Sequence, residues 1–259
     1  MMERFLTDRE YKKGLGWYAK LGGLRSKIAR YLRAEGQILD IGTGHGHFAI
    51  AVAKEMLAGQ IISIDVAVGD VKQAKAFVLA NGLQNKVKIQ LMDATTMNFP
   101  NNSFDFVINF LGLEDIHALL GEEGLVKAVR QMVRVLKPGG KIAITLMPPK
   151  EMETPAQQLD VRIQEYIGQA KWFPRRFYVD LLRTEGIKVL KSKEFYTGRK
   201  LTASQAKQLL YERCAASPKI YSAETPKFNK VWNLFGHDIQ KYGLGYYSKV
   251  VVVIGQKVE

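Results

Sequence analysis

The sequence predicts an α/β protein: a Rossmann-like, doubly wound sheet of seven strands, mostly parallel with an antiparallel last strand, plus a helical insertion. Three observations favour this fold. Short apolar or β-branched runs alternate with helical patterns, glycines crowd the loop after the first run, and the chain ends on a strongly β-prone segment. Strands that alternate with helices are typical of a parallel sheet covered by helices on both faces.

Five apolar or β-branched runs predict the first strands of the sheet. They lie at 37–41, 60–65, 87–92, 104–110 and 141–147. Apolar residues at helical spacing predict helices at 47–57, 71–82 and 125–136. Asn81-Gly82 and the KPGG sequence at 137–140 are typical stop signals, so we expect them to end the second and third of these helices.

The last third of the chain predicts a different arrangement. A helix is expected at 175–186, a strand at 187–202 and a final strand at 245–259. Residues 203–242 read as largely helical, with Pro218 and Pro226 as breaks. We therefore expect two late strands to complete the sheet, with a helical insertion between them.

Length and composition favour one domain without a disulfide framework. The chain has 259 residues and a single cysteine, Cys214, and this length is near the upper limit for one hydrophobic core. No apolar run reaches the roughly 18–20 residues that a membrane span needs. The charged start of the chain contains no apolar signal-peptide region. These features favour a cytoplasmic protein.

The net charge of +13, from 38 basic and 25 acidic residues, favours anionic partners. Nucleic acid, an acidic membrane surface and an anionic small molecule are all compatible with such a charge. A lysine-rich, solvated surface explains it equally well. Charge alone therefore leaves the class of partner open.

The sequence ILDIGTGHGHF, residues 38–48, places three glycines directly after the first predicted strand. In an open parallel sheet, ligands bind beyond the carboxyl ends of the strands, where this loop lies. Gly44, Gly46 and Ala49 fit the G-x-G-x-x-G/A spacing of dinucleotide-binding loops. An S-adenosylmethionine-binding loop needs a similar turn. The loop by itself predicts a nucleotide-type cofactor without choosing between the two.

Several separated motifs resemble the class I S-adenosylmethionine-dependent methyltransferases. An acidic residue two positions before a G-x-G-x-G loop, here Asp40 before Gly42, is typical of that family, and RQMVRVLKPGGKIAIT at 130–145 resembles its helix, turn and fifth strand. The resemblance covers roughly residues 35–147. It is closest to the ubiquinone/menaquinone-biosynthesis-like, or methyltransferase domain 11, branch, which acts on small molecules.

The resemblance implies a role for each motif. Asp40 would be satisfied by loop amides and the cofactor's ammonium group. Asp65 would accept from the ribose hydroxyls, Asp93 and Ala94 would bind the adenine, and Asn109 and Phe110 would lie beside the methionine portion. The complete set of expected cofactor-binding residues is Asp40, Gly42, Thr43, Gly44, Gly46, Asp65, Val66, Asp93, Ala94, Asn109, Phe110 and Tyr18.

A sulfonium methyl is already activated, so such an enzyme mainly aligns nucleophile, methyl group and sulfur. A general base is needed only when the acceptor must lose a proton. His117 is the candidate for that base, although a capping or surface role is the alternative. For His45, in the glycine loop, contact with the cofactor and exposure to solvent both stay open. His47 is expected to open the following helix, and for His237 a place in the substrate cavity and a surface position are the alternatives. No cluster of residues has the spacing of a metal site.

We expect a single domain, 1–259, in which the resemblance gives a cofactor-binding core at 35–147. The segments outside its motifs predict an N-terminal helical lid at 1–34 and a helical insertion at 203–242 that forms a substrate cap. Aromatic and basic residues in the lid and cap favour a small acceptor that is aromatic or anionic. An RNA methyltransferase and a non-catalytic S-adenosylmethionine-binding module are the alternatives, and a dehydrogenase is disfavoured. We expect a monomer or homodimer.

Overall fold

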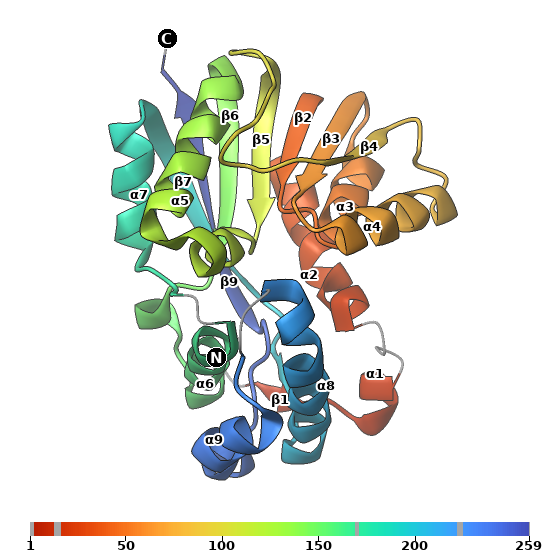
Figure 1. The fold of residues 1–259 in the computed structure, drawn as a ribbon, viewed down its shortest axis with the longest axis vertical. Helices are drawn as coiled ribbons and strands as arrows, with labels where there is room; N and C mark the ends of the chain where they lie inside the picture. Colours follow the sequence, from red (N-terminus) through yellow and green to blue (C-terminus); the bar gives the residue numbers. More distant parts are fainter. Residues whose placement is uncertain (1–2, 13–16, 169–170, 222–224, 259) are drawn as a thin grey trace.

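A computed structural model describes residues 3–12, 17–168, 171–221 and 225–258, without the side chains of 17–22 and 216–221. A twisted sheet with helices on both faces forms one half of the molecule, and a smaller helical body lies beyond one end of its strands (Figure 1). The sheet has seven strands in the order β4-β3-β2-β5-β6-β9-β7. The predicted fold class is therefore confirmed.

Strands β2 to β6 run parallel, whereas β9 is antiparallel to both of its neighbours, β6 and β7. This is the antiparallel last strand that the sequence predicted. The strands are β2 (Gly36–Ile41), β3 (Gly59–Asp65), β4 (Val87–Leu91), β5 (Phe104–Phe110), β6 (Leu136–Leu146), β7 (Ile187–Tyr196) and β9 (Lys249–Lys257). Residues Val250 to Val253 of β9 are fully buried, as expected for a strand covered on both faces.

Helices cover the two faces of the sheet in separate groups. Apolar residues of α2 (Trp17–Leu32), α3 (His47–Glu55) and α4 (Val68–Ala80) pack into the core of one face. Residues of α5 (Leu113–Val135) and α7 (Arg175–Thr184) pack on the other. The α5 helix is broken at Gly121, whose φ is +67°. Only its second half was predicted, because the polar segment around Gly121 has no continuous apolar stripe.

Two of the predicted stop signals behave differently in the structure. The helix before the KPGG sequence ends at Val135, but residues 137–140 belong to β6 rather than to a separate turn. A register shift between Phe104 and Phe106 of β5 lets this strand continue past the irregularity. Pro218 was expected to break the insertion, yet α8 (Ala203–Tyr221) includes it. Only three residues of α8 follow this proline, so it lies close to the point where the helix ends.

The smaller body, here called the cap, packs around its own apolar core. It contains α6 (Pro155–Gly168), which the sequence analysis missed, together with α8 and α9 (Phe228–Tyr242). Two short strands, β1 (Arg4–Phe5) and β8 (Arg199–Lys200), pair in parallel beside these helices. The remaining elements are α1 (Asp8–Lys12) and a 3-10 turn, η1 (Pro149–Glu151). The cap faces the carboxyl ends of the parallel strands (Figure 1).

Within the described part of the chain, no helix is long and apolar enough to cross a membrane. The helices of the cap are amphipathic instead: α9 buries Val231, Phe235 and Ile239 on one face. This spacing is that of a helix lying on a core.

Candidate functional site

The glycine loop joins β2 to α3 at the carboxyl edge of the sheet. Gly42, Gly44 and Gly46 have φ values of +67°, +50° and +80°, a left-handed region that favours glycine. A Cβ atom on Gly44 would meet nothing within 4 Å, whereas one on Gly46 would lie 3.2 Å from Cβ of Ala74. The loop therefore leaves open space at Gly44, and Gly46 allows α3 and α4 to pack closely.

The carboxylate of Asp65, at the end of β3, holds this loop in place. One of its oxygens accepts the backbone N–H of Gly44 at 2.8 Å and the other accepts that of Ala67 at 2.9 Å. Burial raises the pKa of Asp65 despite these hydrogen bonds. Val66, the next residue, is 57% exposed. Asp65 thus fixes the loop and leaves an apolar side chain at its rim.

Asp40 is buried beneath the loop and is satisfied by hydroxyl groups. Its Oδ2 accepts a hydrogen bond from Oγ of Ser63 at 2.5 Å, and Ser63 Oγ lies 3.0 Å from Oγ1 of Thr43. We had expected backbone amides of the loop as donors, but those of Gly42 and Thr43 donate to the carbonyl of Ile64. Burial raises the pKa of Asp40 to about 7. Asp40 and Thr43 therefore anchor the loop from below.

Asp93 and Ala94 follow β4, next to the end of β3. Oδ1 of Asp93 accepts both the N–H and the hydroxyl of Thr95, at 2.7 and 2.8 Å. No described residue donates to its other oxygen, and Ala94 is buried. The Asp93 carboxylate is thus oriented by its own turn, with one oxygen available to a ligand.

Asn109 at the end of β5 carries a polar atom without a partner. Its Nδ2 donates to the carbonyl of Ile41 at 2.9 Å, while its Oδ1 is buried and accepts nothing from the described residues. The next residue, Phe110, packs against Phe48 of α3 with 4.8 Å between the ring centroids. The guanidinium carbon of Arg25 lies 5.0 Å from the centroid of the Phe110 ring. An unsatisfied buried acceptor in a native protein calls for a partner.

The histidines take separate positions. Nδ1 of His117 accepts the backbone N–H of Lys171 at 3.2 Å, and its ring lies edge-on to Phe173. Burial lowers the pKa of His117 and holds that of His47 at about 4, so both are neutral at pH 7. His45 lies 3.2 Å from Asp70. His237 is exposed on α9.

A group of buried charges at the junction of core and cap escaped the sequence analysis. Glu114, in the first turn of α5, is 8% exposed, and its Oε2 has no hydrogen-bond partner among the described residues. Burial raises its pKa well above the usual value, while the charge of Arg213 on α8 acts in the opposite direction. Asp160 of α6 is also buried, with a pKa of about 7. Nothing in the local sequence distinguishes Glu114 from an exposed helix-start glutamate.

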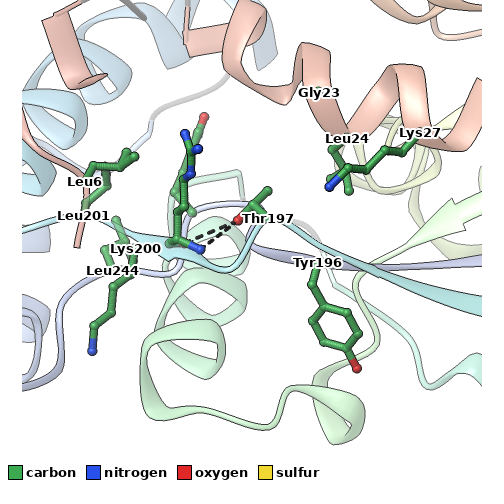
Figure 2. Close-up of a pocket in the computed structure, with 11 residues that line it drawn as sticks. Leu6, Gly23, Leu24, Lys27, Tyr196, Thr197, Lys200, Leu201 and Leu244 are labelled. Carbon is green, nitrogen blue, oxygen red and sulfur yellow. Dashed lines mark hydrogen bonds between the residues drawn. The ribbon is translucent and has the colours of Figure 1, made fainter. Parts of the chain in front are cut away.

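A cavity lies on another side of α2, between this helix and the β1–β8 pair (Figure 2). Its volume is approximately 170 Å³. Gly23 and Lys27 line it from α2, and Tyr196, Thr197 and Arg199 line it from the opposite strands. The cavity is therefore formed by the N-terminal helix and by late segments of the chain together.

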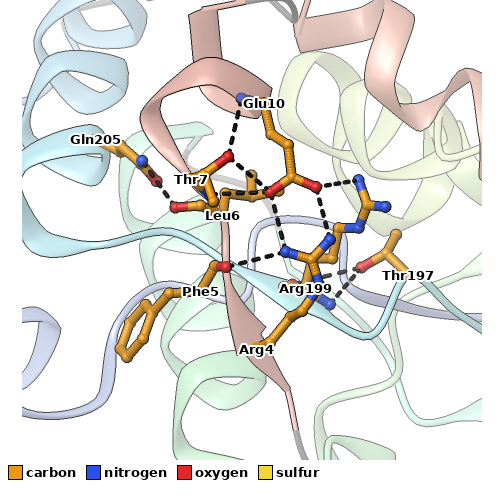
Figure 3. A network of polar contacts seen from close by, with 8 residues as sticks. All are labelled: Arg4, Phe5, Leu6, Thr7, Glu10, Thr197, Arg199 and Gln205. Carbon is orange, nitrogen blue, oxygen red and sulfur yellow. Dashed lines mark hydrogen bonds and ion pairs between the residues drawn. The ribbon is translucent and has the colours of Figure 1, made fainter.

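The start of the chain is tied to the cap by a polar network (Figure 3). Glu10 pairs with Arg4 at 2.6 Å and with Arg199 at 3.4 Å. Gln205 of α8 donates to the carbonyl of Leu6 at 3.1 Å. Residues 3–12 are therefore part of the packed cap. Tyr18, expected at the cofactor, has a side chain outside the described residues, so its role stays a prediction.

No cluster of histidine, cysteine and carboxylate side chains that could hold a metal ion occurs among the residues that the structure describes. The described carboxylates of the loop region take hydrogen bonds from backbone and hydroxyl groups instead.

Comparison with known proteins identifies the central part of the chain. Residues 38–140 match a family model described as "Methyltransferase domain". Over 108 residues the chain is 33% identical to demethylmenaquinone methyltransferase from Bacteroides fragilis, covering 42% of each protein. The chain carries a class I S-adenosylmethionine-dependent methyltransferase domain. This domain is similar to the ubiquinone/menaquinone-biosynthesis methyltransferases, of which one from Pseudomonas putida is 30% identical over 114 residues.

Another relative aligns with more of the chain. Ajmaline N-methyltransferase from Rauvolfia serpentina is 29% identical over 196 residues, which are 68% of this chain and 65% of that enzyme. The aligned part is thus under two thirds of the length of each of these curated relatives. A putative methyltransferase structure from Bacillus halodurans superposes with a TM-score of 0.64 at 18% identity, covering 90% of this chain and 99% of that one. That likeness extends the shared fold beyond the methyltransferase domain.

The residues present fit S-adenosylmethionine. The open space at Gly44 would admit a ligand close to the backbone. The orphaned Oδ1 of Asn109 is an acceptor suited to an ammonium group. One oxygen of Asp93 is available for a donor such as the adenine amino group. The methyltransferase domain therefore offers complementary groups along the carboxyl edge of β2, β4 and β5.

Proposed function

We propose that this protein transfers a methyl group from S-adenosylmethionine to a small-molecule acceptor. The observation that carries the proposal is the orphaned Oδ1 of Asn109, fixed beside the open glycine loop within the matched methyltransferase domain. A buried acceptor without a donor is costly, and the ammonium group of the cosubstrate would satisfy it.

Three side chains would hold the cosubstrate. Asn109 accepts from its ammonium group, and Asp65, already oriented by Gly44 and Ala67, accepts from the ribose hydroxyls. Asp93, oriented by Thr95, accepts from the adenine amino group. Each is held by hydrogen bonds within the protein before any ligand binds, so little reorganisation is needed on binding.

The cosubstrate supplies a methyl group that its sulfonium has activated for in-line displacement. The protein's task is to align the acceptor atom and to keep water out. The side chains of Phe48 and Phe110 provide an apolar wall near Asn109. Where the acceptor must lose a proton, Glu114 joins His117 as a candidate base, because Glu114 is a buried carboxyl group with a raised pKa and an unpartnered oxygen.

The acceptor would bind between the carboxyl edge of the sheet and the cap. Two relatives act, by their names, on demethylmenaquinone and on ajmaline, and both names favour a small aromatic acceptor. We propose the same class of acceptor for this chain because it shares their methyltransferase domain. We further propose that residues 1–34 and the insertion at 203–242 form the walls of this acceptor site. The contacts of residues 3–12 with the cap support such a shared wall.

The test measures S-adenosylhomocysteine formation with a panel of hydroquinones, phenols and amines, and separately with bulk RNA. Turnover of at least one small acceptor, abolished by Asp65→Ala and retained by Asp70→Ala, is the expected result. Asp70 is a matched control, since it lies at the same edge and pairs with His45 rather than with the loop backbone. Turnover of RNA alone would replace the proposal with the RNA methyltransferase alternative. Binding of S-adenosylhomocysteine without turnover of any acceptor would favour a non-catalytic module.

A further inference from the structure

The cavity beside α2 combines a buried apolar lining with a positively charged rim. Leu24, Leu201, Leu244 and Tyr246 line it and are at least nine-tenths buried. Lys27, Arg199 and Lys200 line it as well. Figure 2 shows Lys27 on the side of α2 that faces Thr197 and the neighbouring strands. A ligand there would meet both leucine side chains and cations.

The cations around this cavity outnumber the carboxylates that pair with them. Glu10 is shared between Arg4 and Arg199 (Figure 3). Lys200 donates to the carbonyl of Tyr242 at 2.9 Å, so it gains no carboxylate partner there. Lys27 makes no ion pair with any residue that the structure describes. The rim therefore keeps a net positive charge, which favours an anion.

A second group of charges, formed by Glu153, Glu194 and Lys249, surrounds Tyr196, which lines the cavity. The hydroxyl of Tyr196 lies within hydrogen-bond distance of two carboxylates, Glu153 at 2.9 Å and Glu194, and can donate to one of them at a time. The ammonium group of Lys249, which is buried, pairs with both carboxylates, at 2.7 and 3.1 Å. This cluster holds two carboxylates and one ammonium group, so it offsets one positive charge of the rim and leaves the others uncancelled.

The cavity is distinct from the cofactor site, although one helix borders both. Gly23 and Lys27 are one turn apart on the side of α2 that lines the cavity. Arg25 of the same helix lies over Phe110, next to Asn109. A ligand in the cavity would therefore touch a different face of α2 from the one that borders the cofactor loop.

We propose that this cavity is a binding site for a small amphiphilic anion: an apolar or aromatic body against the leucines, with a carboxylate, sulfonate or phosphate toward Lys27 and Arg199. The proposal does not depend on the proposed function. The same chemistry fits a methyl acceptor whose distal part reaches the cavity and a separate ligand that acts through α2. Binding experiments with and without S-adenosylhomocysteine distinguish these two sources.

The test uses the fluorescent probe anilinonaphthalene sulfonate and its uncharged parent, N-phenylnaphthylamine. Gly23→Leu should fill the cavity, because a Cβ atom at this position meets nothing within 4 Å. It should weaken both probes about tenfold. Lys27→Gln should weaken only the sulfonate, by a factor of about three to ten, since it removes charge and little volume.

Matched controls are available on α4. A Cβ on Gly69 also meets nothing within 4 Å, and Lys72 is exposed on the same helix. Gly69→Leu and Lys72→Gln should leave the affinity for both probes unchanged. Equal binding of the sulfonate by wild type and by Gly23→Leu would overturn the proposal, as would equal loss of both probes in Lys27→Gln.

Titration with S-adenosylhomocysteine tests the proposed function separately from the proposed anion site. We expect the same affinity for it in wild type and in Gly23→Leu, because the cavity is distinct from the cofactor site. Loss of that affinity in Gly23→Leu would overturn the distinction. A lower sulfonate affinity in its presence would assign the anion to the acceptor, and an equal affinity to a separate ligand. Failure of wild type to bind S-adenosylhomocysteine would contradict only the proposed function.

Discussion

Buried acidic groups differ in their hydrogen-bond partners between the carboxyl edge of the sheet and the junction of core and cap. At the edge, Asp40, Asp65 and Asp93 each accept hydrogen bonds from neighbouring hydroxyl or backbone groups. At the junction, Glu114 keeps a buried oxygen with no donor among the described residues. The three aspartates of the edge are thus held by the protein's own donors, whereas Glu114 at the junction and Asn109 at the edge each keep a buried oxygen that a bound molecule would satisfy. In the proposed function, the aspartates of the edge would position the cosubstrate, and Glu114 would lie toward the acceptor.

The largest expected effect concerns the buried carboxyl beneath the loop. Asp40 has a pKa of about 7 in the folded protein, against an ordinary value of 3.8. The folded state therefore binds an extra proton between these values, so the unfolding free energy falls as the pH rises from about 4 to 7. Asp40→Asn removes this loss, which amounts to at most about 4 kcal/mol. Urea unfolding at pH 5 and pH 8 measures it.

The comparison variant for this prediction is Asp160→Asn at the cap junction. Asp160 also has a pKa of about 7, raised by burial. Each substitution should stabilise the protein more at pH 8 than at pH 5, and together they should flatten the pH dependence. A stability difference from wild type that is equal at both pH values would contradict the assignment of these protons.

The next largest effect concerns the clamp on the glycine loop. Asp65→Ala removes the acceptor for Gly44 and Ala67 and, in the proposed function, for the ribose. We expect the affinity for S-adenosylhomocysteine to fall by roughly 1–3 kcal/mol, measured by isothermal titration calorimetry. Asp70→Ala should leave it within a factor of about two. Equal affinity of Asp65→Ala and wild type would place the ribose elsewhere.

A third prediction tests how much the hydrogen bonds of Glu3, at the start of the chain, stabilise the cap. The carboxylate of Glu3 accepts hydrogen bonds from Thr154, Gln157 and Ser248 at 2.7, 3.1 and 2.6 Å. Glu3→Ala leaves two of these buried donors, Gln157 and Ser248, without an acceptor. We expect a loss of about 1–2 kcal/mol in unfolding free energy.

Hydrogen exchange would localise that loss. Backbone amides near residues 153–158 and 245–248 should exchange faster in Glu3→Ala, while those of β2 and β5 should be unchanged. Faster exchange throughout the sheet would mean that core and cap unfold as one unit. That result would remove the distinction between the two regions.

The smallest expected effect separates backbone strain from cofactor contact. Gly44→Ala and Gly82→Ala both place a Cβ at positive φ, +50° and +67°, where no atom lies within 4 Å. Each should cost about 1 kcal/mol of stability. Only Gly44→Ala should also weaken S-adenosylhomocysteine, because Gly82 lies beyond the end of α4. Equal affinities of the two variants would show that the ligand does not approach Gly44.

The features that the sequence predicted depend on local patterns. The runs at 37–41, 60–65 and 104–110 lie within β2, β3 and β5. Short runs of apolar and β-branched residues form buried strands of a parallel sheet, so this pattern can be detected locally. Asn81-Gly82 ended α4 for a similarly local reason, because glycine readily adopts positive φ at a helix end.

The features that it missed depend on contacts between distant segments. The β1–β8 pair joins residues about 195 positions apart, and Glu3 reaches Ser248. The burial of Glu114 follows from how α5, α7 and α8 meet, and two-residue strands carry no periodicity to detect. The candidate cofactor residues were accessible from motifs, whereas the acceptor side depends on tertiary packing.

The position of β9 constrains the order in which the sheet can form. It lies between β6 and β7 and pairs with both, although β7 precedes it in the chain by more than fifty residues. During synthesis β7 therefore has no strand to join, and the edge of β6 stays open until β9 arrives. An open edge with buried-type residues invites pairing with other chains. A chain stalled within the insertion would accordingly be more prone to aggregate than the complete chain.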